Sequence, residues 1–203
     1  NKSKHCKEKN IRLIHIFEDE WRDRKIQVKN FLKSILNVNN QKINARDCLI
    51  SEIDKELAKS FIEINHIQSA HSILVAFGLF YQNELVGVIT GDLHHRQNTQ
   101  ADVLVLSRLC FKEGCNVRGG SSKLFKLLYN YAKDNKYSKI VSWSDNRISE
   151  GRVYEKMGFK LDLEYPPDYS YIKGSQRFSK QSLKKTEDEK LINKTERELR
   201  KEQ

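Results

Sequence analysis

The chain has 203 residues, enough for one ordinary domain with short extensions, and 38% of them are hydrophobic. It contains no apolar run long enough to cross a bilayer and no apolar signal core near its Lys-rich beginning, so we expect neither a membrane protein nor a secreted one. Its four cysteines do not have the paired C-x-x-C spacing of metal or redox motifs. We therefore expect reduced thiols in a cytoplasmic protein, at Cys6, Cys48, Cys110 and Cys115.

The formal net charge of +10 lies mostly at the two ends of the chain. Residues 1–36 hold ten basic and five acidic side chains, and residues 174–203 hold nine and six. A basic excess attracts the phosphates of nucleic acids, although a solvated charged surface has the same composition. We therefore expect DNA as a partner. Residues 174–203 are rich in helix-forming residues and poor in apolar anchors, which predicts a charged helical tail.

The N-terminal quarter predicts two elements in front of a new domain. Apolar and polar residues alternate in "IRLIHIF", residues 11–17, which favours a strand, and apolar residues at helical spacing favour a helix over 18–36. The polar stretch 37–42 is typical of a linker. Residues 43–54 then indicate a strand, and residues 55–65 a short amphipathic helix.

The middle of the chain predicts a β-hairpin, a third strand and a helix that begins at a glycine turn. The apolar runs 73–81 and 84–92 are separated only by Gln82-Asn83, which is typical of a tight hairpin. The run 103–111 is another strong strand, and Gly119-Gly120 precede a helix that reaches about Asn135. The pattern beyond it predicts a strand over 139–144, a helix over 149–156 and two weak strands between 159 and 172. This order indicates a mixed α/β domain with an antiparallel meander.

Two motifs carry a resemblance to a known family. "RGGSSKLF" begins at Arg118 and "VYEKMGF" covers Val153–Phe159. With the order of elements over 43–173, they resemble the GNAT acyltransferase fold, a mixed, mostly antiparallel sheet with flanking helices. The resemblance implies an acyl-CoA site at a glycine turn of the pattern R/Q-x-x-G-x-G/A, followed one strand later by a tyrosine motif. Asn116 stands where that family has Arg or Gln, and Arg147 lies near its usual Asn.

These departures bring the chain nearer to an outlying branch, the Mom-like DNA-modifying proteins of bacteriophages. "RGGSSKLF", "SWSDNR" and "NHIQ" are similar to segments of that branch. The preceding "LIHIFEDEW" resembles the last strand and helix of very-short-patch-repair-type nucleases, which phage genomes join to such domains in homing-endonuclease-like proteins. The resemblance implies a phage-encoded protein in the bacterial host cytoplasm. Its parts are a nuclease-like end over 1–36, a linker over 37–42, a GNAT-like domain over 43–173 and the tail over 174–203.

The glycine turn is the predicted donor site. The first N–H groups of a helix are unpaired and carry partial positive charge, and glycines allow a phosphate to approach the backbone closely. We expect acyl-CoA, acetyl-CoA or a related donor to be held by Arg118, Gly119, Gly120, Ser121, Ser122 and Lys123. The alternative is a tight strand-to-helix turn with a serine cap and no ligand.

Three residues are candidates for acid–base chemistry. Tyr154 could protonate a leaving thiolate, or be a core tyrosine with a paired hydroxyl. Asp145 could accept a proton from an amine or position it, or cap the following helix. His66 could act as a base, or be an ordinary loop histidine. On the third strand, Ser107 and Arg108 are candidates for substrate binding.

Other chemistries have weaker support. No P-loop is present, and the spacing of His94, His95, Cys110 and Cys115 matches no zinc finger, so no metal site is expected. Neighbouring acids on one helix point in different directions, so any nuclease carboxylates are expected upstream of Asn1. Three hypotheses remain: a GNAT-fold transferase acting on DNA or a DNA-bound target, a general N-acyltransferase, and a non-catalytic GNAT-like module that helps a nuclease hold DNA.

Overall fold

The computed structural model describes residues 2–38, 41–149, 151–166 and 169–183. The chain forms two compact units, residues 1–160 and 161–203. The second unit contains the antiparallel hairpin β8 (Ser170–Lys173) and β9 (Gln176–Ser179), followed by the 3-10 turn η2 (Lys180–Leu183). The described part of the predicted helical tail is therefore a strand and a turn, and the tail from residue 184 lies outside the described residues. The predicted division of the chain into four parts stays a prediction.

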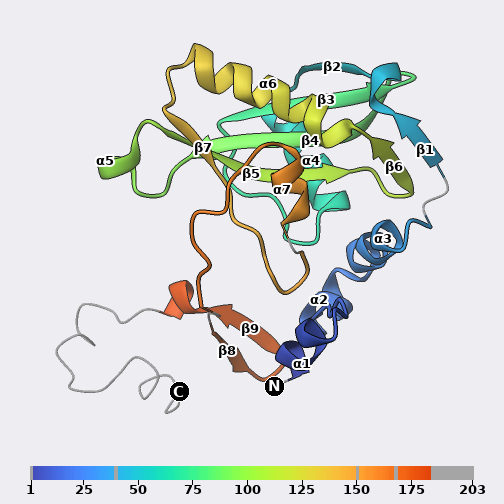
Figure 1. Cartoon of the computed structure of the whole chain (residues 1–203), viewed down its shortest axis with the longest axis vertical. Helices are drawn as coiled ribbons and strands as arrows, with labels where there is room; N and C mark the ends of the chain where they lie inside the picture. The colour runs from blue at the N-terminus through green and yellow to red at the C-terminus, as the bar shows by residue number, and fades with distance from the viewer. Residues whose placement is uncertain (1, 39–40, 150, 167–168, 184–203) are drawn as a thin grey trace. The chain divides into compact units, whose positions relative to one another are not determined.

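A five-stranded mixed sheet is the centre of the first unit (Figure 1). In space its strands follow the order β2 (Leu49–Glu52), β3 (Val75–Tyr81), β4 (Glu84–Leu93), β5 (Val103–Phe111) and β7 (Lys139–Val141). All neighbouring pairs are antiparallel except β5 and β7, which are parallel. The prediction of a mixed, mostly antiparallel sheet with flanking helices is confirmed.

The hairpin between β3 and β4 has the turn that its sequence predicts. Gln82 and Asn83 both have positive φ, 50° and 65°. A two-residue loop with two left-handed residues matches the twist of the strands it connects, and asparagine tolerates that conformation better than most residues. The turn sets the register of the pairs beside it, Tyr81 with Glu84 and Phe80 with Leu85, and an irregularity at Leu79 then shifts the pairing by one residue.

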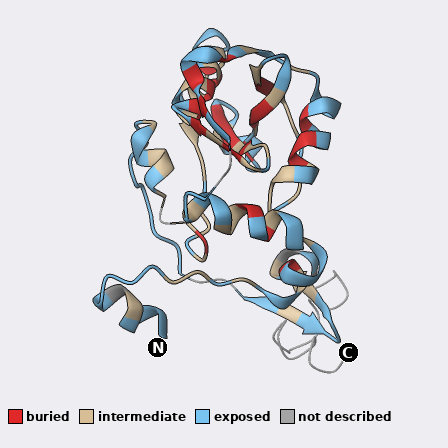
Figure 2. Cartoon of the chain, turned by 90° about the vertical axis from the view of Figure 1, so that its right-hand side faces the viewer, coloured by how far each residue is buried: buried red, intermediate tan, exposed pale blue. Residues whose placement is uncertain are grey.

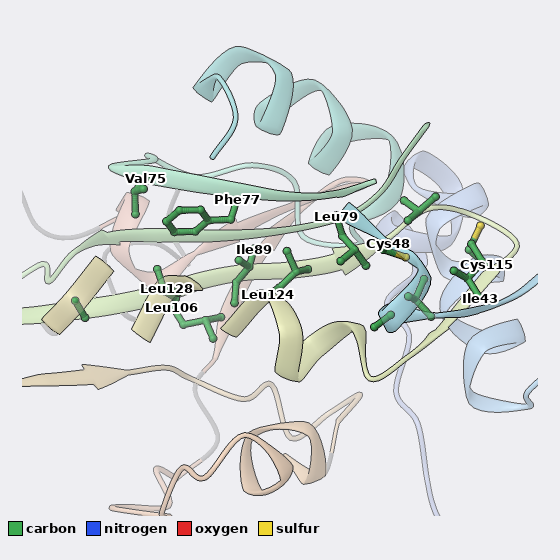
Figure 3. Close-up of a cluster of buried hydrophobic side chains, with 14 of the residues drawn as sticks. Ile43, Cys48, Val75, Phe77, Leu79, Ile89, Leu106, Cys115, Leu124 and Leu128 are labelled. Atoms are coloured by element: carbon green, nitrogen blue, oxygen red, sulfur yellow. The ribbon is translucent and has the colours of Figure 1, made fainter. Parts of the chain in front are cut away.

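Two helices cover opposite faces of this sheet. Helix α6 (Gly120–Asp134) packs Leu124 and Leu128 against the larger core cluster, which Figure 3 shows in close-up. Helix α4 (Lys55–Asn65) buries Ala58, Phe61 and Ile62 against the smaller cluster on the other face. Buried residues accordingly gather on the strands and on the inner sides of these helices (Figure 2).

A bulge in β5 changes which of its side chains face which helix. Thr90 pairs with Arg108 and Gly91 with Leu106, so Ser107 is an extra residue in the ladder. Before the bulge, Leu106 belongs to the α6 core; after it, Cys110 belongs to the α4 core. A one-residue insertion moves each later side chain to the other face of a strand. Arg108 therefore projects toward α4.

A second, two-stranded sheet lies beside the glycine turn. Strand β1 (Gln41–Asn44) pairs in parallel with β6 (Cys115–Arg118). The sequence analysis predicted a strand from residue 43 but not β6, a short strand that directly precedes the turn. The 3-10 turn η1 (Ala45–Asp47) follows β1 and lies near the start of α6. A Cβ at Gly119 would be 3.6 Å from the Cβ of Ala45.

The residues before the sheet differ most from the prediction. They contain α1 (Lys2–Glu8), α2 (Glu18–Asp23) and α3 (Lys25–Ile35), so the helix predicted over 18–36 is interrupted at Arg24. The strand predicted over 11–17 is wrong. This segment has no ladder partner among the residues that the structure describes, and the backbone N–H of His15 donates to the carbonyl of Arg147 at 3.0 Å.

Shorter elements complete the first unit. They are α5 (Gln97–Gln100) and α7 (Arg152–Lys156), and both β7 and α7 are shorter than predicted. All four cysteines are free. In the part of the chain that the structure describes, no helix combines the length and the apolar character needed to cross a membrane.

Candidate active site

The ladder between β5 and β7 is short, and the candidate site surrounds its open end. The two strands pair only from Val103 to Val105, opposite Lys139 to Val141. The hydroxyl of Ser142 then donates to the carbonyl of Leu106 at 2.9 Å, and the chain leaves the sheet. Strand β5 continues to Phe111 and stays paired with β4 on one side. Its other side, beyond Val105, has no strand partner among the described residues.

The glycine turn contains two glycines, and each position needs a glycine for a different structural reason. Gly119 is the N-cap of α6 with φ 77°, a conformation that other residues rarely adopt. Gly120 is required by packing, because a Cβ there would lie 2.6 Å from Cε1 of Phe111. Among the described residues, no side chain caps this helix. The predicted serine cap is therefore absent, and the first-turn N–H groups have no intrahelical acceptor.

The side chains around this turn are suited to an anionic group, with one exception. Arg118 and Ser122 are exposed and Ser121 is half-buried. The ammonium of Lys123, in contrast, donates to the carbonyls of Ala45 at 2.9 Å and Cys48 at 2.6 Å. A phosphate-bearing donor fits the backbone N–H groups, the guanidinium and the hydroxyls. These two hydrogen bonds leave one of the three ammonium donors of Lys123 for a ligand.

The two strand residues predicted to bind substrate, Ser107 and Arg108, both contact protein groups, and their role in substrate binding stays a prediction. The hydroxyl of Ser107 lies 2.8 Å from that of Thr90, which is fully buried. The Nε of Arg108 donates to the carbonyls of Ser69 at 2.9 Å and Gln68 at 3.2 Å. Burial lowers the pKa of Arg108, and Tyr154 is the strongest of the neighbouring groups that oppose this shift. Arg108 thus fixes the loop over residues 66–70 and lies near Tyr154.

His66 begins that loop and is a weak base. Its Nδ1 accepts a hydrogen bond from the backbone N–H of Gln68 at 3.0 Å. Burial, and then the nearby charges of Arg108 and Arg24, lower its pKa to about 4. At neutral pH the ring is therefore uncharged and has its proton on Nε2. In this state His66 can donate a hydrogen bond more readily than it can take a proton.

Asp145 is held in place by several donors. Its carboxylate accepts from Gln68 Nε2 at 3.2 Å, from Arg147 Nη2 at 2.9 Å and from the backbone N–H of Arg147 at 3.1 Å. Helix α7 begins much later and has Gly151 as its N-cap, so Asp145 does not cap it. Asp145 therefore joins the loop over 66–70 to the segment that follows β7.

Arg147 is a site residue whose partners the sequence analysis missed. Its Nη1 donates to Glu20 Oε2 at 2.6 Å and to the carbonyl of His15 at 3.2 Å, and its guanidinium lies 4.4 Å from the centre of the Phe17 ring. Burial opposes its charge, but the hydrogen bonds to Glu20 and Asp145 raise its pKa. Arg147 thus couples Asp145 to the residues around α2.

Tyr154 packs between the site and α6. Its hydroxyl donates to the carbonyl of Trp143 at a long 3.4 Å. Its ring makes an edge contact with Phe159, at 5.6 Å between ring centres, and Phe159 in turn lies 5.0 Å from Phe125 of α6. The ring is thus fixed by packing while the hydroxyl makes only a weak hydrogen bond. The structure therefore brings Tyr154, Arg108, Asp145 and His66 together around one loop.

His94, His95, Cys110 and Cys115, whose spacing matched no zinc finger, do not form a cluster in the described part of the chain. In residues 2–38, 41–149, 151–166 and 169–183, no group of three or more His, Cys, Asp and Glu side chains could hold a metal ion. His94 and His95 stack on each other, at 4.4 Å between ring centres. Cys110 is buried in the α4 core, where burial raises its pKa to about 12.

Comparisons with known proteins found one family model and several solved structures of low sequence identity. A model of the Mom protein family matches residues 47–203. Among solved structures, the aminoglycoside N-acetyltransferase AAC(6')-Iy in complex with CoA is 13% identical, with a TM-score of 0.49 over 63% of this chain and 95% of that chain. A ribosomal-protein-alanine N-acetyltransferase from Brucella melitensis is 16% identical, with a TM-score of 0.46 over 60% of this chain and 98% of that one. No curated protein sequence matches the chain.

Proposed function

The chain belongs to the Mom protein family, and on this basis we propose that it is a GNAT-fold transferase that modifies DNA or a DNA-bound target. We further propose acyl-CoA or a related phosphate-bearing molecule as the donor, and the host cytoplasm of a phage-infected bacterium as its location. In this proposal, residues 1–36 are the end of a nuclease-like domain. They lie outside the family match but within the first compact unit.

The observation that carries the donor assignment is the uncapped first turn of α6. Gly119 leaves the first N–H groups of the helix without a side-chain acceptor, and Arg118 and Ser122 are exposed beside them. Such a helix end attracts phosphate through its N–H groups and its partial positive charge. A bound acyl-CoA supplies an acyl group that is activated as a thioester.

The residues around the loop over 66–70 then have separate roles. Among the described residues the Tyr154 hydroxyl makes one long hydrogen bond, so it is the group best placed to donate to a leaving atom. Asp145 and Arg108 hold the loop in place through Gln68 and Ser69. His66, uncharged at neutral pH, can donate a hydrogen bond from Nε2.

DNA is proposed as the target because basic residues are in excess at both ends of the chain. Residues 1–36 have a net charge of +5, from ten basic and five acidic residues, and residues 174–203 have +3, from nine and six. DNA affinity should fall with added salt, with a log–log slope of about 0.9 for each phosphate contact. Deleting residues 174–203 should make this slope shallower and should leave donor binding unchanged.

One pair of observations favours a second function, a non-catalytic DNA-binding module. Lys123 and Asp145, two of the predicted site residues, already have protein partners. Such a module would use the same fold and the same basic ends to hold DNA, without any transfer. The two functions differ in donor binding, because only a transferase needs a donor at the glycine turn.

Two binding experiments separate the three hypotheses. Calorimetry with a CoA thioester should show binding to the unchanged protein, and Ser122→Ala, which removes one hydroxyl of the turn and adds no charge, should bind only slightly more weakly. Ser122→Asp should not bind the thioester, because a carboxylate in this turn repels phosphate. The same carboxylate interacts favourably with the helix dipole, so the variant should still fold. The second experiment is the salt titration of DNA affinity. Binding of both ligands supports the transferase. Binding of DNA but not of the CoA thioester supports the non-catalytic module. Binding of the CoA thioester but not of DNA supports a general N-acyltransferase.

A further inference from the structure

Three aromatic side chains form a cluster where β4 and β7 end. His94 and His95 follow β4 and stack on each other, with 4.4 Å between their ring centres. Trp143 follows β7, and its ring centre lies 5.7 Å from that of His94 and 5.8 Å from that of His95. Residues from two different strands therefore present adjacent rings. We call His94, His95 and Trp143 the aromatic platform.

The aromatic platform has a buried base and an exposed surface. His94 is only 4% exposed, its Nδ1 accepts from the backbone N–H of Arg96 at 3.1 Å, and its carbonyl accepts from Gln97. Trp143 is 48% exposed and His95 is exposed as well. A tryptophan that is held by neighbours on one side and open to solvent on the other offers a flat apolar surface to a ligand.

Two basic side chains outside the platform, Arg96 and Lys139, lie near His94. Burial lowers the pKa of His94, and the charges of His95, Arg96 and Lys139 lower it further, which places these basic groups within electrostatic reach. Asp102 is close to Lys139 and is the acidic neighbour on this side. Arginine or lysine side chains beside an exposed aromatic ring are the combination that binds single-stranded nucleic acid, because phosphates meet the cations and bases stack on the ring.

The platform is also attached to the candidate active site. The carbonyl of Trp143 accepts the hydrogen bond of the Tyr154 hydroxyl at 3.4 Å. Ser142, the preceding residue, is anchored to the carbonyl of Leu106 on β5. This contact is to the backbone of Trp143, so it places the residue proposed to donate the proton beside the segment that carries the ring. An enzyme that modifies a base must first take it out of the duplex stack.

We propose that the aromatic platform binds an unpaired base of DNA by stacking on Trp143 beside Tyr154. The inference rests on the proposed function, because it names the part of the DNA that the site receives. Stacking on an aromatic side chain tolerates any base, so the platform provides affinity for the unpaired state and no sequence preference. Arg96 and Lys139 provide contacts for the adjacent phosphates.

Tryptophan fluorescence can test the stacking directly. The chain has two tryptophans, so Trp21→Phe leaves Trp143 as its single tryptophan. We expect a short single-stranded oligothymidylate to quench this fluorescence. An abasic oligonucleotide of the same length and charge should bind without quenching. Quenching by both oligonucleotides, or by neither, would overturn the inference.

Affinity measurements provide a second test with a matched control. Trp143→Ala should weaken binding of oligothymidylate by about 5- to 150-fold, the range for loss of one stacked base, and should leave abasic binding unchanged. Trp143→Phe should retain most of the affinity. Trp21→Ala is the control, because Trp21 is exposed to a similar degree, 43%. An equal loss for both oligonucleotides in a folded Trp143→Phe protein would contradict stacking.

The outcome is distinguishable from failure of the proposed function. Fluorescence and affinity are measured without any donor, so they report the platform alone. If base-dependent quenching occurs but DNA is never modified, the platform remains and the transferase assignment is lost. If DNA is modified but Trp143 shows no base-dependent quenching, the transferase remains and the platform is rejected.

Discussion

Replacing Arg147 by alanine should destabilise the first compact unit. The guanidinium donates to Glu20 at 2.6 Å and to Asp145 at 2.9 Å. The side chains of Arg147, Glu20 and Asp145 are only 16%, 10% and 28% exposed. Arg147→Ala would leave two poorly solvated carboxylates without their cation, while both keep weaker donors: the backbone N–H of Phe17 for Glu20, and Gln68 for Asp145.

The size of the effect follows from these contacts. Removing one partner of a fully buried ion pair costs about 3 to 5 kcal/mol, because the remaining charge is left unpaired. Asp145 is partly solvated and both acids retain a donor, so we expect the lower end, about 3 kcal/mol in the free energy of unfolding. In a double-mutant cycle, Glu20→Gln and Arg147→Ala together should cost about 1 to 2 kcal/mol less than their sum.

Urea denaturation followed by circular dichroism measures this change. The control is Arg22→Ala, because Arg22 also makes a two-pronged contact, with Asp23 at 2.7 Å, but this pair is exposed and should have no measurable effect. A midpoint for Arg147→Ala that equals that of Arg22→Ala would refute the coupling between the residues around α2 and the segment that follows β7. So would strict additivity in the double-mutant cycle.

Two further predictions concern stability. Gly120→Ala should destabilise the protein by about 1 to 3 kcal/mol, because its Cβ would lie 2.6 Å from Phe111. In urea denaturation, Ser122→Ala in the same turn should leave the midpoint unchanged. Equal midpoints for the two variants would contradict the packing of Gly120 against Phe111. For His66, the folded pKa of about 4 is below the ordinary 6.5, so its stabilising contribution is complete above pH 6.5 and is lost as pH falls toward 4. We expect about 2 to 3 kcal/mol over this window; an unchanged pH dependence in His66→Gln would contradict it.

Local patterns predicted the hairpin and α6 because their causes are local. A period of two, the Gln82-Asn83 turn and apolar residues at helical spacing are all visible in one segment of sequence. The glycine turn was found for the same reason, although Gly120 turned out to be explained by Phe111, a residue of another strand. Alternation over 11–17 misled because it reports which residues face apolar surroundings. It does not report whether a partner strand is present.

The contacts that build the candidate site are between distant segments and could not be predicted. Glu20 and Arg147 are far apart in sequence, and no local pattern around either residue indicates that the two form an ion pair. The bulge at Ser107 left a faint signal, since Ser107 and Arg108 interrupt the apolar run "VLVLSRLCF" there. Its effect on Arg108 depends on α4 and the loop over 66–70. The sequence thus indicated the kinds of residue at the site but not their partners.

Mass spectrometry of DNA tests the central claim most directly. DNA is incubated with the protein and a bacterial extract as the source of donor, and its nucleosides are then weighed. We predict a mass increase with the unchanged protein and with Tyr129→Phe, whose tyrosine is exposed on α6, and none with Tyr154→Phe. DNA that binds but never gains mass would contradict the transferase assignment, and an equal gain with Tyr154→Phe would contradict the role of its hydroxyl.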